Sequence, residues 1–231
     1  MNTPPLHVIS SMGTQKLLAE LADRYQQVHP DAPVRVESVG GVEAARRVRA
    51  GEPFDAVALA SDALDQLIDS GHVVRGSRVD IVSSGVAAAV RAGAERPDIG
   101  TEEALRQAVL AAPTLGYSTG PSGVQLQKLF ERWGVADRIA ARVVTAPPGV
   151  PVGALVANGQ VALGFQQLSE LMHLPGIDVI GPLPQPAQIT TIFSIGLGTS
   201  CARPEAVRAL QAFLASPEVA DIKRDHGMAP P

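Results

Sequence analysis

The hydrophobic positions of this chain alternate between short apolar runs and longer segments with helical spacing. Residues 6–9, 34–36, 55–59 and 115–117 are short, mostly apolar runs typical of buried strands. Residues 14–28 instead repeat apolar side chains every three or four positions and stop before a proline. Because short connections separate such segments in the first half, the pattern predicts parallel strands with helices covering both faces of a sheet.

The same pattern continues to the end of the chain. We expect helices at 14–28, 42–50, 62–68, 102–111, 122–133, 152–157 and 204–214, with a shorter one after Pro217. We expect strands at 6–9, 34–36, 55–59, 79–82, 86–90, 115–117, 142–144, 162–165, 177–180 and 189–197.

Two of these strands belong to long apolar stretches that suggest a two-lobed chain. One stretch, 79–90, is interrupted by Ser83-Ser84-Gly85, and the other, 189–197, has a glycine near its end. Such strands are expected where a chain passes from one lobe to another. We therefore predict an α/β fold with mixed, mostly parallel sheets and a ligand cleft between the lobes. Lobe 1 would comprise residues 1–83 and 193–231, and lobe 2 residues 84–192.

Loops rich in serine, threonine and glycine recur between a predicted strand and a predicted helix. They are Ser10-Ser11-Met12-Gly13-Thr14, Val39-Gly40-Gly41, Ala60-Ser61-Asp62 and Ser118-Thr119-Gly120-Pro121-Ser122-Gly123. A helix N-terminus presents unpaired N–H groups with partial positive charge, and small residues let an anion approach them. The alternative is that these loops are ordinary helix caps and turns. Their repetition favours a site for an oxyanion or a polycarboxylate.

The composition excludes several classes of partner. Of the 231 residues, 45% are hydrophobic, 18% are charged and 3% are aromatic, which argues against disorder and against base-stacking modules. The formal net charge of −4 provides no basic surface for nucleic acid. No apolar run is long enough to span a bilayer, so we expect no membrane insertion.

Metal and cofactor chemistry find no support in the sequence. Cys201 is the single cysteine, so neither an internal disulfide nor a cysteine cluster can form. The 5 histidines lack metal-ligand spacing, and no phosphate-binding loop or Gly-x-Ser-x-Gly motif occurs. We expect no metal and no cofactor. The N-terminal residues show no export signal, which predicts a cytoplasmic protein as the chain stands, or a periplasmic one if a signal was removed.

Several motifs resemble those of the type II periplasmic-binding-protein superfamily, in the branch of molybdate-binding proteins. They are the opening strand with Ser10-Ser11, Gly40-Gly41, Phe54-Asp55-Ala56-Val57 and Gly116-Tyr117-Ser118-Thr119-Gly120-Pro121-Ser122-Gly123. Residues 147–153, 164–170 and 223–228 are similar to the narrower subgroup of bacterial aconitate isomerases. The resemblance covers essentially the whole chain. It implies two α/β lobes joined by crossing strands, with the ligand held by helix N-termini and hydroxyls.

Carried over by position, the resemblance implies a set of ligand contacts. These contacts are Ser10, Ser11, Gly40, Gly41, Ser61, Ser118, Thr119, Gly120, Ser122 and Gly123. The full predicted ligand set also includes Arg46, Ser84, Val152, Gln166 and Gln167. Arg46 would offer a forked donor to a carboxylate, although a solvated helix face explains it equally well. The Gly-Pro-Ser-Gly element and the Gln166-Gln167 pair suit a multi-carboxylate ligand better than a compact tetrahedral oxyanion.

Two functions remain open at this point. The first is a solute-binding protein that takes a small anion, a di- or tricarboxylate, and presents it to an ABC-type membrane transporter. The alternative is an aconitate isomerase that interconverts cis- and trans-aconitate by an allylic proton shift. An isomerase needs an acid–base group with a pKa near neutrality. Tyr117 is the first candidate, and Asp62, Glu170 and His173 are the others, each with a structural explanation as well.

Overall fold

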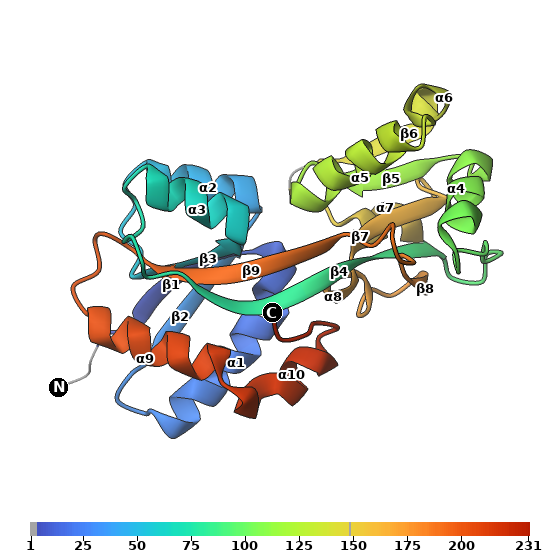
Figure 1. The fold of residues 1–231 in the computed structure, drawn as a ribbon. Coiled ribbons are helices and arrows are strands. Elements are labelled where there is room, and N and C mark those ends of the chain that lie inside the picture. The colour runs from blue at the N-terminus through green and yellow to red at the C-terminus, as the bar shows by residue number, and fades with distance from the viewer. Residues whose placement is uncertain (1–3, 148) are drawn as a thin grey trace. The chain divides into compact units, whose positions relative to one another are not determined.

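The computed structural model describes residues 4–147 and 149–231, which form two compact units. Unit 1 comprises Met1–Ser83 and Ile192–Pro231, and unit 2 comprises Ser84–Thr191. The chain leaves unit 1 within strand β4 (Val79–Arg91) and returns within strand β9 (Thr190–Leu197) (Figure 1).

The sheet of unit 1 is built on three parallel strands. β1 (Leu6–Ser11) pairs in parallel with β2 (Val34–Val39) on one side and β3 (Ala56–Ala60) on the other. β9 then pairs antiparallel with β3. The predicted parallel arrangement of the first half is therefore confirmed, and the antiparallel β9 makes the sheet mixed.

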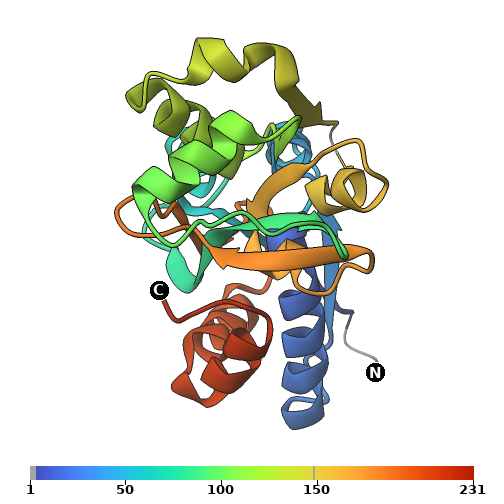
Figure 2. The ribbon, with the colours of Figure 1, turned by 90° about the vertical axis from the view of Figure 1, so that its right-hand side faces the viewer.

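Helices cover both faces of this sheet because its central strands, β1 and β3, carry buried side chains on both faces. α1 (Gln15–Val28), α9 (Pro204–Ala215) and α10 (Ala220–Asp225) lie side by side on one face, with the short 3-10 helices η1 (Met12–Thr14) and η3 (Pro217–Val219) (Figures 1 and 2). α2 (Gly41–Arg49) and α3 (Ser61–Asp69) cover the other face. Neighbouring strand residues point to opposite faces, so Val8 belongs to the first apolar cluster and Ile9 to the second.

Unit 2 follows the same principle. β5 (Leu115–Ser118) pairs in parallel with β6 (Val143–Ala146) and β7 (Leu163–Gln167), while β4 pairs antiparallel with β7 and with β8 (Ile177–Pro182). One apolar cluster includes α4 (Glu102–Ala111), α5 (Pro121–Arg132) and α6 (Ala136–Ile139), which is followed by η2 (Ala140–Arg142). Separate clusters contain α7 (Val152–Ala157) and α8 (Leu168–Leu171).

The structure extends several strands beyond their predicted ends. β1 continues through Ser11 and β7 through Gln167, since neighbouring strands supply backbone partners to these polar residues. β4 is one strand, because Ser83-Ser84-Gly85 adopts the extended conformation and does not end it. The four-residue helices α6 and α8 were not predicted, because a single turn has no periodicity to detect. Within the described residues, no helix has the length and apolar character needed to cross a membrane.

Gly123 provides a test of the loop that opens α5. A Cβ atom at Gly123 would stand 1.7 Å from the carbonyl oxygen of Ser118, so alanine cannot fit without moving the backbone. We expect Gly123→Ala to lower the free energy of unfolding by about 2 kcal/mol or more. Urea unfolding measures this change. Gly120→Ala is the matched control, because its Cβ would lie 3.5 Å from the Ser118 hydroxyl, and equal losses in both variants would contradict the prediction.

Candidate functional site

In each unit, parallel strands end at one edge of the sheet, and helices begin there. In unit 1, β1, β2 and β3 are followed directly by η1, α2 and α3. In unit 2, β5, β6 and β7 are followed by α5, α7 and α8. We call these the carboxyl edges of unit 1 and unit 2. Ligands of α/β proteins commonly bind at such edges.

The helices that begin at the carboxyl edges lack side-chain caps. The N-cap residues of α2, α3, α5 and α7 form no side-chain hydrogen bond to their helices; these residues are Gly40, Ala60, Gly120 and Pro151. In contrast, the Thr101 hydroxyl caps α4 by accepting from the Ala104 N–H at 3.1 Å. The first N–H groups of α2, α3, α5 and α7 are therefore not used by a cap side chain, as is also the case for α1, α6, α9 and α10.

The carboxyl edge of unit 1 carries four of the predicted residues, Ser10, Ser11, Gly41 and Ser61. The Ser10 hydroxyl lies 2.6 Å from that of Ser38 at the end of β2. Ser11 is buried, and its hydroxyl has no hydrogen-bond partner. Gly41 packs beside it, since a Cβ atom at Gly41 would stand 3.6 Å from that of Ser11. Ser61 opens α3 at the same edge.

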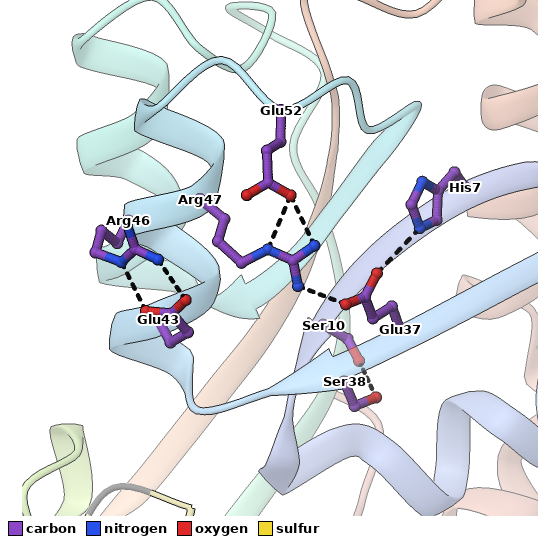
Figure 3. Close-up of polar contacts among 8 residues, drawn as sticks. All are labelled: His7, Ser10, Glu37, Ser38, Glu43, Arg46, Arg47 and Glu52. Atoms are coloured by element: carbon purple, nitrogen blue, oxygen red, sulfur yellow. Dashed lines mark hydrogen bonds and ion pairs between the residues drawn. The ribbon is translucent and has the colours of Figure 1, made fainter.

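The Arg46 guanidinium is already paired with a carboxylate of its own helix. It donates two hydrogen bonds to Glu43, at 2.7 and 2.6 Å, on the exposed face of α2 (Figure 3). This supports the solvated-face interpretation of Arg46. This ion pair could have been predicted from the sequence, because Glu43 precedes Arg46 by three residues in the same predicted helix.

The neighbouring Arg47 holds α2 to the sheet. Its guanidinium donates to Glu37 of β2 at 2.5 Å and to Glu52 at 2.7 and 2.9 Å (Figure 3). These bonds hold the pKa of both carboxyls below their ordinary value. His7 of β1 lies 3.3 Å from Glu37, so the network joins β1, β2 and α2. It thereby fixes the helix whose first turn faces Ser11.

In unit 2, the two ends of the loop from Ser118 to Gly123 pack closely against each other, with Gly123 beside the Ser118 carbonyl. The Ser118 hydroxyl accepts a hydrogen bond from the Gly120 N–H at 3.3 Å, so this hydroxyl is partly used within the loop. Thr119 lies between them, and Ser122 is buried in the first turn of α5. Val152 is also buried, so its side chain belongs to the core below α7.

The two glutamines at the end of β7 face different partners. Gln166 accepts from the Gly153 N–H at 3.3 Å and donates to Glu170 at 2.6 Å. Gln167 donates to the Thr191 hydroxyl at 2.7 Å, and its Oε1 is buried without a partner.

Ser84 joins this edge from β4. It is two residues from Val86, which pairs with Gln167. Its hydroxyl is buried and has no partner.

Within residues 4–147 and 149–231, the buried side-chain polar atoms without a hydrogen-bond partner belong to Ser11, Ser84 and Gln167. All three belong to the predicted ligand set. An unsatisfied buried polar group destabilises a fold by about 1 to 3 kcal/mol, and native proteins keep few of them. Each of the three lies at or beside a carboxyl edge.

Of the candidates for an acid–base group, Glu170 has the most suitable environment. Burial of its carboxyl raises the pKa from 4.5 to about 7, although the hydrogen bond from Gln166 acts in the opposite direction. Tyr117 is 6% exposed and packs in the core, with its ring 6.1 Å from that of Phe130. Asp62 is exposed and accepts from the Ala63 N–H, and His173 follows α8. In the sequence, Tyr117 stands beside the Ser118 loop, whereas the burial of Glu170 is not visible in any motif.

The raised pKa of Glu170 predicts a pH-dependent stability difference. The folded state binds this proton more tightly than the unfolded state, so the resulting stabilisation is complete below pH 4.5 and is lost as pH rises to about 7. Glu170→Gln is neutral at all pH values. We expect its free energy of unfolding to rise relative to wild type, by up to about 3 kcal/mol, between pH 4.5 and pH 8.

Urea unfolding of both proteins at several pH values measures this difference. Glu131→Gln, the same change at an exposed glutamate of α5, is the matched control. A constant difference between Glu170→Gln and wild type at every pH would contradict a raised pKa.

The sequence of the chain matches the family of bacterial extracellular solute-binding proteins over residues 6–229. It is 39% identical to an aconitate isomerase of a Pseudomonas species over 233 aligned residues, which cover 97% of this chain and 87% of the relative.

Two solved structures illustrate the similarity of fold. The periplasmic molybdate-binding protein of Azotobacter vinelandii aligns with a TM-score of 0.79 and 18% identity, covering 98% of this chain and 99% of that chain. A binding protein of Agrobacterium tumefaciens in complex with agropinic acid aligns with a TM-score of 0.74 and 12% identity, covering 99% and 83%. At these identities the likeness shows the fold alone. The predicted α/β fold class and the resemblance to periplasmic binding proteins are confirmed. The chain belongs to the family of bacterial extracellular solute-binding proteins.

Proposed function

We propose that this protein binds a small organic anion with two or three carboxylates. The observation that carries the proposal is the set of buried, unpartnered polar groups at the two carboxyl edges. Ser11 and Ser84 can each donate a hydroxyl hydrogen to a carboxylate oxygen. The uncapped helices add backbone N–H groups and the positive ends of their dipoles.

Gln167 can also donate a hydrogen bond to an anion if its amide group rotates. The Thr191 hydroxyl, 2.7 Å away, can donate or accept. A rotated Gln167 amide would therefore keep the bond to Thr191 and turn its NH₂ group toward an anion. This arrangement satisfies the buried amide when ligand is bound.

Several donors spread over separate loops favour a polycarboxylate over a compact oxyanion. Molybdate and agropinic acid appear in the names of similar structures, so the fold itself is compatible with either class. The relative at 39% identity is named for aconitate, a tricarboxylate, and it covers nearly the whole of this chain. This supports the carboxylate class.

Isomerisation of aconitate is a second candidate function. It is favoured by the same relative and by a carboxyl with a pKa of about 7 at the carboxyl edge of unit 2. The two functions differ in the cellular compartment and the partner that they require. A transport function requires export and a membrane transporter as partner, whereas an isomerase requires neither. Chromatography of cis- and trans-aconitate after incubation with the protein decides between binding alone and turnover.

A thermal-shift panel tests the ligand class. We expect citrate, cis-aconitate and trans-aconitate to stabilise the protein more than molybdate, sulfate or phosphate, because the donors are numerous and separated. A ligand at about 100 times its Kd stabilises the folded state by about 2.7 kcal/mol. Stabilisation by molybdate with none from the carboxylates would refute the proposal.

Replacement of the unpartnered hydroxyls tests their role directly. Ser11→Ala and Ser84→Ala should each leave the free protein equally stable or stabilise it by up to about 1 kcal/mol, since a buried unsatisfied group is removed. Each should weaken binding of the best carboxylate by about 10- to 100-fold, the loss of a hydrogen bond to a charged group.

Urea unfolding without ligand and calorimetric titration with ligand give the two quantities. Ser70→Ala is the matched control, because the Ser70 hydroxyl already donates to the Gln66 carbonyl at 2.7 Å at the end of α3. Unchanged affinity in both edge variants would show that these hydroxyls do not contact the ligand.

A further inference from the structure

We infer that Glu170 is the proton-transferring group of an allylic isomerisation and that Gln166 is its positioning residue. The inference rests on the second candidate function given above and assigns that function to particular atoms. It is carried by the geometry of the carboxyl edge of unit 2, where β7 ends and α8 begins.

The Gln166 amide has one possible orientation. Its Oε1 accepts from the Gly153 N–H at 3.3 Å, and a backbone N–H can only donate. The Nε2 group must therefore face Glu170, to which it donates at 2.6 Å. This bond occupies Oε2 of Glu170, so the proton to be exchanged with substrate belongs on Oε1.

Burial of the Glu170 carboxyl favours its neutral form, and the hydrogen bond from Gln166 favours its anion. The neighbouring residues Leu168 and Leu171 of α8 belong to an apolar cluster with Ala87, Ala89, Ile177 and Val179. On the neighbouring strand β8, Asp178 is held by Arg96 at 3.1 Å and by the Gly93 N–H at 3.3 Å.

His173, one turn beyond Glu170, is the other titratable group close to it in the chain. With a pKa of about 7, Glu170 holds a proton about half of the time at neutral pH and can both accept and return one.

The reaction balances with one carboxylate and no other reagent. Glu170 Oε1 takes a proton from the methylene carbon of aconitate, and the C–H electron pair forms a new double bond to the central carbon. The former double-bond pair moves to the outer alkene carbon, which takes the proton back from Glu170. The double bond has then moved by one carbon, and Glu170 returns to its starting state.

The other candidates are less suited to this step. The Tyr117 ring packs in the core with Phe130, and Asp62 lies exposed on α3 of unit 1. The Gln166 amide cannot transfer a proton, but its hydrogen bond to Oε2 determines which Glu170 oxygen is available. Glu170 and Gln166 therefore act as a pair.

The experiment compares wild type, Glu170→Gln and Glu131→Gln. We measure interconversion of cis- and trans-aconitate by chromatography and binding of cis-aconitate by calorimetry. Glu170→Gln should lower kcat by about 10²-fold or more while Kd changes less than threefold, because the amide keeps size and a hydrogen bond to Gln166 but cannot carry the proton. Glu131→Gln should match wild type, since Glu131 is exposed on α5.

Deuterium exchange gives a second readout that does not depend on net turnover. Incubation of aconitate in D₂O with wild type should label its allylic carbons, as seen by proton NMR, and Glu170→Gln should abolish the labelling. Gln166→Leu tests the positioning role. Loss of its hydrogen bond raises the pKa of Glu170, so the acidic limb of the kcat/KM profile, expected near pH 7 in wild type, should move to higher pH.

The outcomes separate this inference from the proposed function. Turnover by wild type that persists in Glu170→Gln overturns the inference and leaves the isomerase function intact; loss in Tyr117→Phe would then assign the step to Tyr117. Binding of cis-aconitate by wild type without turnover or deuterium exchange overturns both the inference and the isomerase function. Absence of binding overturns the carboxylate proposal as well. A Glu170→Gln protein that fails to unfold cooperatively is replaced by Glu170→Asp, for which full wild-type kcat would overturn the inference.

Discussion

The parallel pairing of strands determines where the candidate site residues of this protein lie. Parallel strands end at the same sheet edge, and each connection to the next helix must begin there. In unit 1 this places Ser11, Gly41 and Ser61 at one edge, and in unit 2 it places Ser118, Gly153 and Gln167 at another. The helices beginning at these edges lack side-chain caps, and the hydroxyls of Ser11 and Ser84 have no hydrogen-bond partner.

Most elements could be predicted because their apolar spacing is strong. The helices at Glu102–Ala111 and Val152–Ala157 have the predicted bounds, and β1, β5 and β7 differ only in how far they extend. The extensions occur at polar residues, whose strand conformation depends on partners far away in sequence. No local pattern contains that information.

The candidate site could be predicted as a set of loops but not as a set of working side chains. Glycine and serine at a strand end are visible in sequence, and Ser11, Ser84 and Gln167 proved to hold unpartnered atoms. Arg46 is paired with Glu43 of its own helix, and burial together with the hydrogen bond from Gln166 sets the pKa of Glu170. Ion pairing and desolvation depend on three-dimensional packing, which explains why these two assignments needed the structure.

The interrupted course of unit 1 has a consequence for synthesis on the ribosome. One side of β3 is paired by β9, and the first apolar cluster needs Phe193, Ile195 and Leu210 as well as Leu6 and Leu17. Residues Ser84–Thr191 are made in between, which takes roughly 5 to 20 s at ordinary rates of elongation. Throughout that interval the N-terminal strands carry an unpaired β3 edge and an open apolar face. The nascent chain must therefore be protected until β9 emerges, while unit 2, continuous in sequence, can fold first.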